Sequence, residues 1–385
     1  MKTNSRRTAA YIIVRWLITK EFPQTMLPSG SDRAFVQDLV YTVLRRLRAL
    51  RKVLGELVKT WPKGELEALL YVGAAQILYM DDVPDFAAVN ETVEAAKACE
   101  NKSIARVVNG TLRNLIRRKE EFLARLASAS IETRESFPTA IVKRWQARFG
   151  EAQTEQLCQW HNLPAETYLA RKDGSFVKLE RGRRVNEVEG YDDGDFIVQD
   201  PGTGLAIELM AVKAGERVLD ACAAPGGKTI QLSWRGALVT ACEVNPKRRR
   251  RLEENLTRLN LPVKTVGSLD EASTLGEGFQ KVLVDAPCSN TGVFRRRPDA
   301  RWNWTEEKLS ALVRLQAEIL DQAAKAVVSG GTLVYSTCSV EAEENELQVR
   351  AFLERHPEFK LVESRFSLPV ETHFDGAFAA ALQKQ

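Results

Sequence analysis

The chain has 385 residues, of which 44% are hydrophobic and 28% charged, a composition typical of a soluble protein with two or three domains. No apolar run reaches the roughly 20 residues of a membrane-spanning helix, and Arg15 and Lys20 interrupt the apolar stretch near the start where a signal peptide would lie. Six cysteines without a C-x-x-C pair, with only three histidines, argue against a zinc site. We therefore expect a cytoplasmic protein without a metal.

Positive charge is concentrated in the first third of the chain. Residues 1–125 contain 21 Lys and Arg against 14 Asp and Glu, a net charge of +7, whereas the remainder contains 34 against 37, a net charge of −3. A basic segment of this kind is typical of a part that binds a polyanion such as RNA. The candidates for phosphate contacts are Arg45, Arg46, Arg48, Arg51 and Lys52. For any one of them, a solvated helix face is nearly as good an explanation.

Residues 6 to about 125 have the periodicity of helices throughout. Apolar residues recur at intervals of three and four, for example at Leu39, Val43, Leu47 and Leu50. Proline and glycine break the pattern near residues 23–28, 61–64 and 81–84. We expect a small all-helical bundle as the first domain, residues 1–125.

The next range, residues 126–212, changes character partway. Residues 126–150 continue the helical pattern across Pro138, whereas 175–179 and 195–199 are short alternating runs among Gly and Asp that indicate strands. We interpret the range as a small α+β linking subdomain.

From residue 213 to 385 short apolar runs alternate with helical stretches, which is typical of an α/β fold with a parallel sheet. The expected strands are 217–219, 238–242, 263–266, 281–284 and 332–335, and the expected helices are 246–259 and 306–328. Near the end, Asp375-Gly376 between apolar flanks predicts a tight hairpin, so the last strands should be antiparallel. A parallel sheet with a reversed hairpin suits a methyltransferase better than a nicotinamide-binding protein.

A loop of small residues follows the first of these strands, which ends at Asp220. It contains Cys222, Ala223, Ala224, Pro225, Gly226, Gly227 and Lys228 and opens a helix. Small residues allow a ligand close to the backbone, and a helix N-terminus attracts a carboxylate or phosphate. A phosphate-binding P-loop would need glycine where Cys222 stands, and the G-x-G-x-x-G spacing is absent. The loop is therefore either a plain tight turn or a cradle for the methionine end of S-adenosyl-L-methionine.

The second strand ends at Glu243, which lies 23 residues after Asp220. An acid at this spacing can accept hydrogen bonds from both hydroxyls of a ribose, as acids do in dinucleotide-binding folds. An exposed glutamate at a strand end is the alternative for Glu243 alone. Together with the loop, the spacing favours S-adenosyl-L-methionine as the cofactor.

Two cysteines stand just beyond the ends of two further strands. Cys288 follows Asp285 in the segment 284–292, and Cys338 ends the run 330–338. Ligands of open α/β sheets bind at the carboxyl ends of the strands, so neighbouring strands would bring both thiols and Asp285 to one cleft. A lone cysteine is more often an inert core residue, but two at corresponding strand ends argue against that explanation.

This set of residues suits the methylation of cytosine at C5, which is too weak a nucleophile to react unaided. A thiolate that adds to C6 makes C5 nucleophilic, an acid near N3 stabilises the adduct, and a second thiol can assist when the C5 proton leaves.

Taken together, the motifs resemble the RsmB (Sun) branch of the RNA cytosine-C5 methyltransferases, and the likeness covers essentially the whole chain. Residues 32–41, 83–93 and 108–113 look like its NusB-like N-terminal RNA-binding domain. The core motifs with residues 296–299 and 375–378 look like its Rossmann-like, S-adenosylmethionine-dependent catalytic domain.

The resemblance implies a role for each matching residue. Cys338 would be the nucleophile and Cys288 would help product release, the reverse of the DNA enzymes, whose Pro-Cys cysteine attacks. Residues 222–228, Glu243 and Asp285 would contact the cofactor, with either Ser268 or Asp270 at the adenine.

The implied substrate is a cytosine of 16S ribosomal RNA, unpaired or flipped out to reach a thiol. We also expect RNA contacts near the target base from three arginines close behind Cys288, namely Arg295, Arg296 and Arg297. We expect a monomer that binds neither DNA nor a membrane. Two alternatives remain, namely the same chemistry on transfer RNA or another ribosomal site, and a non-catalytic RNA-binding or antitermination factor.

Overall fold

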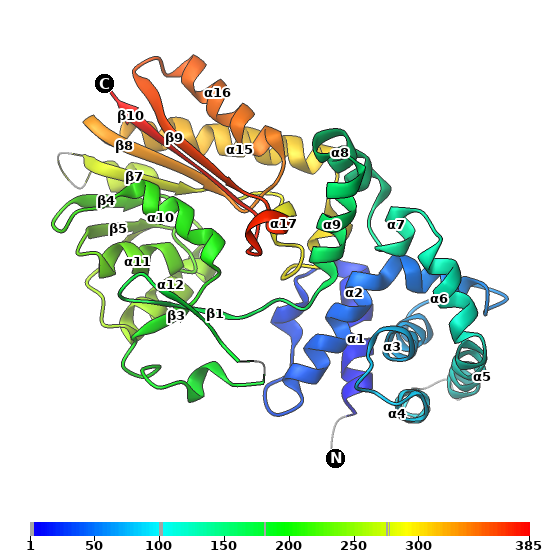
Figure 1. Ribbon diagram of the computed structural model, residues 1–385. Helices are drawn as coiled ribbons and strands as arrows, with labels where there is room; N and C mark the ends of the chain where they lie inside the picture. The colour runs from blue at the N-terminus through cyan, green and yellow to red at the C-terminus, as the bar shows by residue number, and fades with distance from the viewer. Residues whose placement is uncertain (1–3, 100–102, 181, 275, 277) are drawn as a thin grey trace. The chain divides into compact units, whose positions relative to one another are not determined.

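The computed structural model describes residues 4–99, 103–180, 182–274, 276 and 278–385 (Figure 1). The chain divides into two compact units, Met1–Leu163 with Arg297–Asn303, and Pro164–Arg296 with Trp304–Gln385. The boundary after Leu163 falls inside the range 126–212 that the sequence predicted as a linking subdomain. The three predicted domain ranges stay a prediction, and residues 1–3 and 100–102 of the first, 181 of the second, and 275 and 277 of the third lie outside the described part.

The first unit is helical, as the sequence predicted. Its helices are α1 (Ser5–Thr19), α2 (Arg33–Gly55), α3 (Glu65–Tyr79), α4 (Asp85–Lys97), α5 (Ser103–Arg117), α6 (Lys119–Ala127), α7 (Ile131–Arg134), α8 (Thr139–Phe149), α9 (Glu151–Asn162) and α14 (Ala300–Asn303), with a 3-10 turn η1 (Pro23–Met26). The predicted breaks lie in the connections between α1 and α2, between α2 and α3, and between α3 and α4. A continuous helix across Pro138 was wrong, because α7 ends at Arg134 and Pro138 takes the N-cap position of α8.

The core of the first unit contains the residues whose spacing indicated a helix. Leu39, Val43, Leu47 and Leu50 of α2 are all buried. A segment distant in sequence also belongs to this unit. Arg301 in α14 is fully buried and donates to Asn162 Oδ1 (2.9 Å) and the His161 carbonyl (3.0 Å). Residues 297–303 are therefore an integral part of the helical unit.

A small antiparallel sheet lies in the second unit, with the order β2-β1-β3. Its strands are β1 (Tyr168–Arg171), β2 (Phe176–Lys178) and β3 (Phe196–Val198). The predicted strands 175–179 and 195–199 are thus confirmed, and β1 is the shared neighbour that the sequence did not reveal. Ala170 and Ile197 pack with Leu252 in one apolar cluster, which joins this sheet to the larger layer.

The main body of the second unit is a seven-stranded sheet with the order β6-β5-β4-β7-β8-β10-β9. Its strands are β4 (Arg217–Asp220), β5 (Leu238–Cys242), β6 (Lys264–Val266), β7 (Phe279–Asp285), β8 (Val327–Thr337), β9 (Phe359–Ser367) and β10 (Ala377–Lys384). Neighbours from β6 to β8 are parallel, and β10 is antiparallel to both β8 and β9. All five predicted strands and the α/β class are confirmed.

Helices cover both faces of this sheet (Figure 1). The helices of the second unit are α10 (Gly204–Met210), α11 (Gly227–Trp234), α12 (Pro246–Arg258), α13 (Leu269–Ser273), α15 (Glu306–Lys325), α16 (Glu346–Arg355) and α17 (Pro369–Thr372), with short turns η2 (Val185–Glu187), η3 (Pro201–Thr203), η4 (Thr291–Val293) and η5 (Ala342–Glu344). Helices α10, α11 and α12 pack on one face, and α13, α15 and α16 on the other. Helix α15 ends at Lys325, before the predicted residue 328, because Val327 already begins β8.

The C-terminal strands are antiparallel, as predicted, but the tight hairpin turn was wrong. Strand β9 ends at Ser367 and β10 begins at Ala377, with α17 between them. Asp375 is buried and accepts from the Arg296 guanidinium, and Gly376 N donates to the Gly292 carbonyl (2.9 Å). Tertiary contacts therefore hold the Asp-Gly pair. Among the described residues no helix is long and apolar enough to span a bilayer.

Replacing either of two helical glycines of the first unit by alanine should change the free energy of unfolding, but in opposite directions. A Cβ at Gly73 of α3 would come within 2.3 Å of the Leu112 side chain, whereas one at Gly110 of α5 would meet nothing within 4 Å. We expect Gly73→Ala to lower the free energy of unfolding by about 1–3 kcal/mol through overpacking. Gly110→Ala should raise it by about 0.5–1 kcal/mol. Urea unfolding followed by circular dichroism measures both, and equal effects would contradict this packing.

Candidate active site

The two cysteines meet because β7 and β8 are neighbouring parallel strands. Their register pairs Asp285 with Ser336, so Cys288 and Cys338 follow at three and two residues beyond the paired positions. The Sγ atoms lie 3.1 Å apart. The structure thus brings together the three residues that the sequence assigned to one cleft.

The two thiols differ in their surroundings. Cys288 is buried, whereas Cys338 is partly exposed and contacts Asn290 Oδ1 at 3.4 Å. The hydrogen bond with Cys338, followed by burial, raises the pKa of Cys288 well above its ordinary value. A thiol that retains its proton is a poor nucleophile. The arrangement therefore favours Cys338 as the attacking sulfur.

Asp285 connects the cysteines to the loop after β4. Lys228 Nζ donates to Oδ2 of Asp285 (2.6 Å), and Ser336 Oγ donates to Oδ1 (2.8 Å). Burial by itself would lower the pKa of Lys228, but the charge and hydrogen bond of Asp285 outweigh it and raise this pKa. Lys228 is therefore an ammonium group within the site, and it orients the carboxylate of Asp285.

The loop from Cys222 to Lys228 joins β4 to α11, at the carboxyl edge of the sheet. Gly226 has φ +112°, a conformation that favours glycine, and a Cβ at Gly227 would meet the Gln199 side chain at 3.2 Å. Burial raises the pKa of the Cys222 thiol in this loop, which disfavours its reactive thiolate form. The loop thus has the small residues and tight backbone that a closely bound ligand requires.

Asp220, at the end of β4, has an unused hydrogen-bonding atom beside this loop. Its Oδ2 accepts from Thr229 Oγ1 (2.6 Å), but its buried Oδ1 has no partner among the described residues. Burial raises the pKa of Asp220 to about 6. A buried acceptor without a donor costs free energy, so this atom suits a ligand that carries an ammonium group.

Glu243 follows β5 at the same edge of the sheet. Its carboxylate is buried, accepts from Asn245 N (2.9 Å) and lies 3.4 Å from the Arg248 guanidinium. The two candidates for the adenine follow β6. Ser268 caps α13 by accepting from Glu271 N, and Asp270 in the first turn of α13 is exposed. The acids thus line the ends of successive strands, and the choice between Ser268 and Asp270 stays a prediction.

Glu344 is a site residue that the sequence did not reveal. It is fully buried, and its carboxylate accepts from Ser289 N (2.8 Å), Ser289 Oγ (2.5 Å) and Gln316 Nε2 (3.0 Å). Ser289 Oγ also lies 3.3 Å from Ser339 Oγ, so this network joins the residues that directly follow both cysteines. Burial raises the pKa of Glu344. Its sequence context, Glu343-Glu344-Asn345-Glu346, is typical of an exposed segment and gave no signal.

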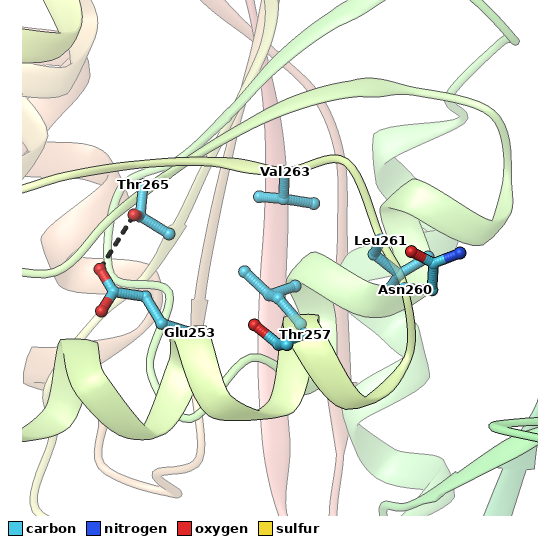
Figure 2. A pocket seen from close by; sticks show the side chains of 7 residues that line it. Glu253, Thr257, Asn260, Leu261, Val263 and Thr265 are labelled. Atoms are coloured by element: carbon cyan, nitrogen blue, oxygen red, sulfur yellow. Dashed lines mark hydrogen bonds between the residues drawn. The ribbon is translucent and has the colours of Figure 1, made fainter. Parts of the chain in front are cut away.

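A shallow pocket lies elsewhere in the second unit. It encloses about 310 Å³ and is lined by Glu253, Leu256, Thr257, Asn260, Leu261, Val263 and Thr265 (Figure 2). Figure 2 shows Thr265 directed at Glu253, to which it donates a hydrogen bond of 3.0 Å. None of the predicted site residues lines this pocket, so it is not part of the site.

The arginines of α2 predicted to bind RNA make several contacts within the first unit. Arg46 lies 3.5 Å from Glu135, Arg48 donates to the Phe137 carbonyl (3.0 Å), and Arg51 donates to the Tyr71 hydroxyl (2.8 Å). Arg45 is buried, and Lys52 is exposed. Burial argues against a phosphate contact by Arg45, and RNA binding by the other four stays a prediction.

The three arginines after Cys288 are also held within the chain. Arg295 is buried and donates to the Pro164 carbonyl (2.9 Å), and Arg296 pairs with Asp200 and Asp375. Arg297 belongs to the first unit, where it pairs with Asp299 at 3.1 Å. These contacts argue for a structural role of Arg295 and Arg296, and RNA binding by all three stays untested.

Comparisons with known proteins identify the same kind of protein over both parts of the chain. The family model for the 16S rRNA methyltransferase RsmB/F matches residues 207–383, and that for the NusB family matches residues 3–117. The ribosomal RNA small subunit methyltransferase B of Vibrio cholerae is 35% identical over 92% of this chain and 90% of the relative. That of Cronobacter sakazakii is 34% identical over 99% of both.

Solved structures share the fold. The structure of PH0851 superimposes over 100% of both chains with a TM-score of 0.81 at 23% identity. NSun6 from Pyrococcus horikoshii, solved with SFG, matches 64% of this chain and 98% of its own with a TM-score of 0.57 at 19% identity. At these identities the similarity shows the fold alone.

Replacing Glu344 should disturb the loops that carry both cysteines. Glu344→Ala leaves Ser289 N without its acceptor, at a cost of about 1–3 kcal/mol for a buried group, and leaves Gln316 Nε2 with only the Pro287 carbonyl. We expect a lower melting temperature and faster alkylation of the buried Cys288 by iodoacetamide, mapped by mass spectrometry. Glu344→Gln is the matched control, because its amide can accept from Ser289 N and donate to a serine hydroxyl. Equal labelling of Cys288 in the wild type and Glu344→Ala would exclude this positioning role.

Proposed function

The chain belongs to the RsmB/F family of 16S rRNA methyltransferases, and from this premise we propose that Cys338 carries its chemistry, methylation of a ribosomal cytosine at C5. The chain is an S-adenosyl-L-methionine-dependent RNA methyltransferase with a Rossmann-like core. The observation that carries the proposal is the 3.1 Å approach of Cys338 to Cys288, beside the ion pair of Asp285 with Lys228. Covalent methylation of a pyrimidine at C5 needs one thiolate that adds to C6, and here a carboxylate and a second thiol lie beside that thiol to assist.

Several residues fit S-adenosyl-L-methionine, which supplies an electrophilic methyl group on its sulfonium when bound. The unpartnered Oδ1 of Asp220 suits the ammonium of the methionine part, and the loop at Gly226 and Gly227 admits close backbone contact. Glu243 suits the ribose hydroxyls, and Ser268 or Asp270 the adenine. These assignments rest on position and donor chemistry.

We assign the first covalent step to Cys338. Its thiolate forms a bond to C6 of the cytosine, and the electrons of the C5=C6 double bond make C5 nucleophilic toward the methyl group. A proton delivered to N3 through Asp285, which Lys228 and Ser336 hold, neutralises the negative charge that thiolate addition leaves on the ring. A base then takes the C5 proton, the C5–H bonding pair re-forms the C5=C6 double bond, and the bonding pair of the Cys338–C6 bond returns to sulfur as thiolate. Cys288 assists this release step.

The proposed substrate is RNA, which the first unit would bind. The first unit matches the NusB family model and residues 1–125 have a net charge of +7, which supports RNA binding through phosphates. We propose a cytoplasmic monomer that acts on a cytosine flipped out of the RNA, without DNA or a membrane as a partner.

Two other substrates or roles are the alternatives. Transfer RNA or another ribosomal cytosine would use the same residues, whereas a non-catalytic RNA-binding factor would not need a pair of adjacent thiols. Transfer of tritiated methyl groups to 16S rRNA, but not to transfer RNA, followed by bisulfite mapping, tests the proposed substrate. Methylation of transfer RNA alone would refute it.

The two cysteines should give opposite results when replaced. We expect Cys338→Ala to abolish both methylation and the covalent protein–RNA adduct, because no thiolate can add to C6. Cys288→Ala should still add and transfer the methyl group but release slowly, so that an adduct accumulates on a denaturing gel. Cys242→Ala, a buried cysteine of β5, is the control and should form no lasting adduct. An adduct trapped by Cys338→Ala and lost in Cys288→Ala would reverse the assignment.

Cofactor affinity should depend on pH through Asp220. Its pKa of about 6 means that the carboxylate is ionised above pH 6 and protonated below. Affinity for S-adenosyl-L-methionine, measured by calorimetry from pH 5 to 8, should therefore fall as pH decreases through 6, by up to about tenfold per pH unit. Asp220→Asn should bind weakly without this dependence. Glu243→Gln should bind weakly yet keep it, and a flat profile for the wild type would contradict the role of Asp220.

A further inference from the structure

The first two turns of α12 contain a run of five basic residues that no part of the proposed mechanism uses. We name Lys247, Arg248, Arg249, Arg250 and Arg251 the basic turn. All of them are exposed except Arg249, which is partly buried, while Leu252 and Leu256 bury the opposite face of the helix. The basic turn is therefore a surface feature of the catalytic unit.

This arrangement is unfavourable for the helix itself. The N-terminus of a helix attracts negative charge, yet the first turn of α12 contains no acidic residue. Lys247 and Arg251 are four residues apart, where like charges repel. Residues that oppose the electrostatic preferences of their own helix in this way are expected where a function requires them.

The positive charge of the basic turn is only partly neutralised. Arg250 pairs with Glu254 (3.0 Å) and Arg249 with Glu253 (3.9 Å), each within the exposed helix, where such pairs contribute little. Lys247 and Arg251 make no ion pair with any residue that the structure describes. The side chain of Arg250 is 82% exposed, so its guanidinium remains accessible despite the ion pair with Glu254.

The position of the basic turn points to its ligand. Arg248 donates to the Ala224 carbonyl of the cofactor loop (2.9 Å) and lies 3.4 Å from Glu243. The basic turn therefore lies at the edge of the sheet where the strand ends carry Asp285 and the cysteines. S-adenosyl-L-methionine carries a net positive charge, because its sulfonium and ammonium outweigh its carboxylate, so the basic turn does not serve to attract it.

We propose that the basic turn binds the phosphate backbone of the substrate RNA beside the cofactor, as a second RNA contact within the catalytic unit. This inference rests on the proposed function. Lys247, Arg250 and Arg251 hold phosphates, whereas Arg248 stays with Ala224 and Glu243. Phosphate contacts release counterions, so each one steepens the salt dependence of binding.

The test is the full-length triple variant Lys247→Gln, Arg250→Gln, Arg251→Gln. Its binding to a fluorescein-labelled 16S rRNA transcript is measured by polarisation from 50 to 400 mM salt. We expect about tenfold weaker binding at 0.1 M salt and a log–log slope shallower by about 2–3. Affinity for S-adenosylhomocysteine should be unchanged, and the melting temperature should not fall, because the substitutions remove repulsion from the helix.

The matched control replaces three exposed lysines, Lys213, Lys264 and Lys360, by glutamine, the same change of charge near the starts of β4, β6 and β9. It should bind RNA with nearly the wild-type slope. If the basic-turn variant matches the wild type in affinity and slope, the proposal is overturned and an acidic protein becomes the expected partner. Equal losses in both variants would also overturn it, because net charge alone would then explain binding. Failure of the wild type to methylate the transcript would refute the proposed function separately.

Discussion

Parallel pairing of β7 with β8 is the constraint on which the site depends. The register of Asp285 with Ser336 determines which residues leave the sheet at the same level, and it brings Cys288 and Cys338 to within 3.1 Å. A slip by one residue would turn the side chains to the opposite face of the sheet and separate the thiols. Backbone contacts reinforce this register, because Gly292 N donates to the Cys338 carbonyl (3.0 Å).

Buried charges hold the irregular segments around this pair of strands. Glu344 binds the loop after Cys288 from within, and Arg296 lies between Asp200 and Asp375. Burial raises the pKa of Asp375 to about 6 even though the charge of Arg296 opposes it. Charges of this kind are costly to bury unless they are paired and hydrogen-bonded, and removing one partner leaves the other uncompensated. The ionic contacts therefore determine where each loop lies, while the apolar layers on both faces of the sheet supply most of the stabilisation.

A single stretch of chain contributes to both units. Arg296 belongs to the catalytic unit, whereas residues 297–303 belong to the helical unit, where Arg301 is fully buried and Trp302 Nε1 donates to the Leu44 carbonyl (2.7 Å). The arginine-rich sequence after Cys288 looked like an RNA-binding segment, yet much of it is occupied by contacts inside the protein. The exposed basic turn of α12, in contrast, was not among the residues that the sequence predicted to bind RNA. Charge in a sequence and charge available at a surface are different properties.

The sequence by itself predicted most of the elements, the family and a set of candidate site residues. Periodicity predicted five strands of the sheet and the bundle helices, and the run of small residues predicted the loop at Gly226, because these features depend on residues close together in the chain. The spacing of Asp220, Glu243 and the two cysteines predicted a cofactor edge, since strand ends in a parallel sheet share one side. Only the tertiary structure decided which polar residues are buried. Glu344 and Arg301 occur in segments that look exposed, and Asp375-Gly376 looks like a tight turn. Burial and pairing depend on which distant segments become neighbours, and no local pattern contains that information.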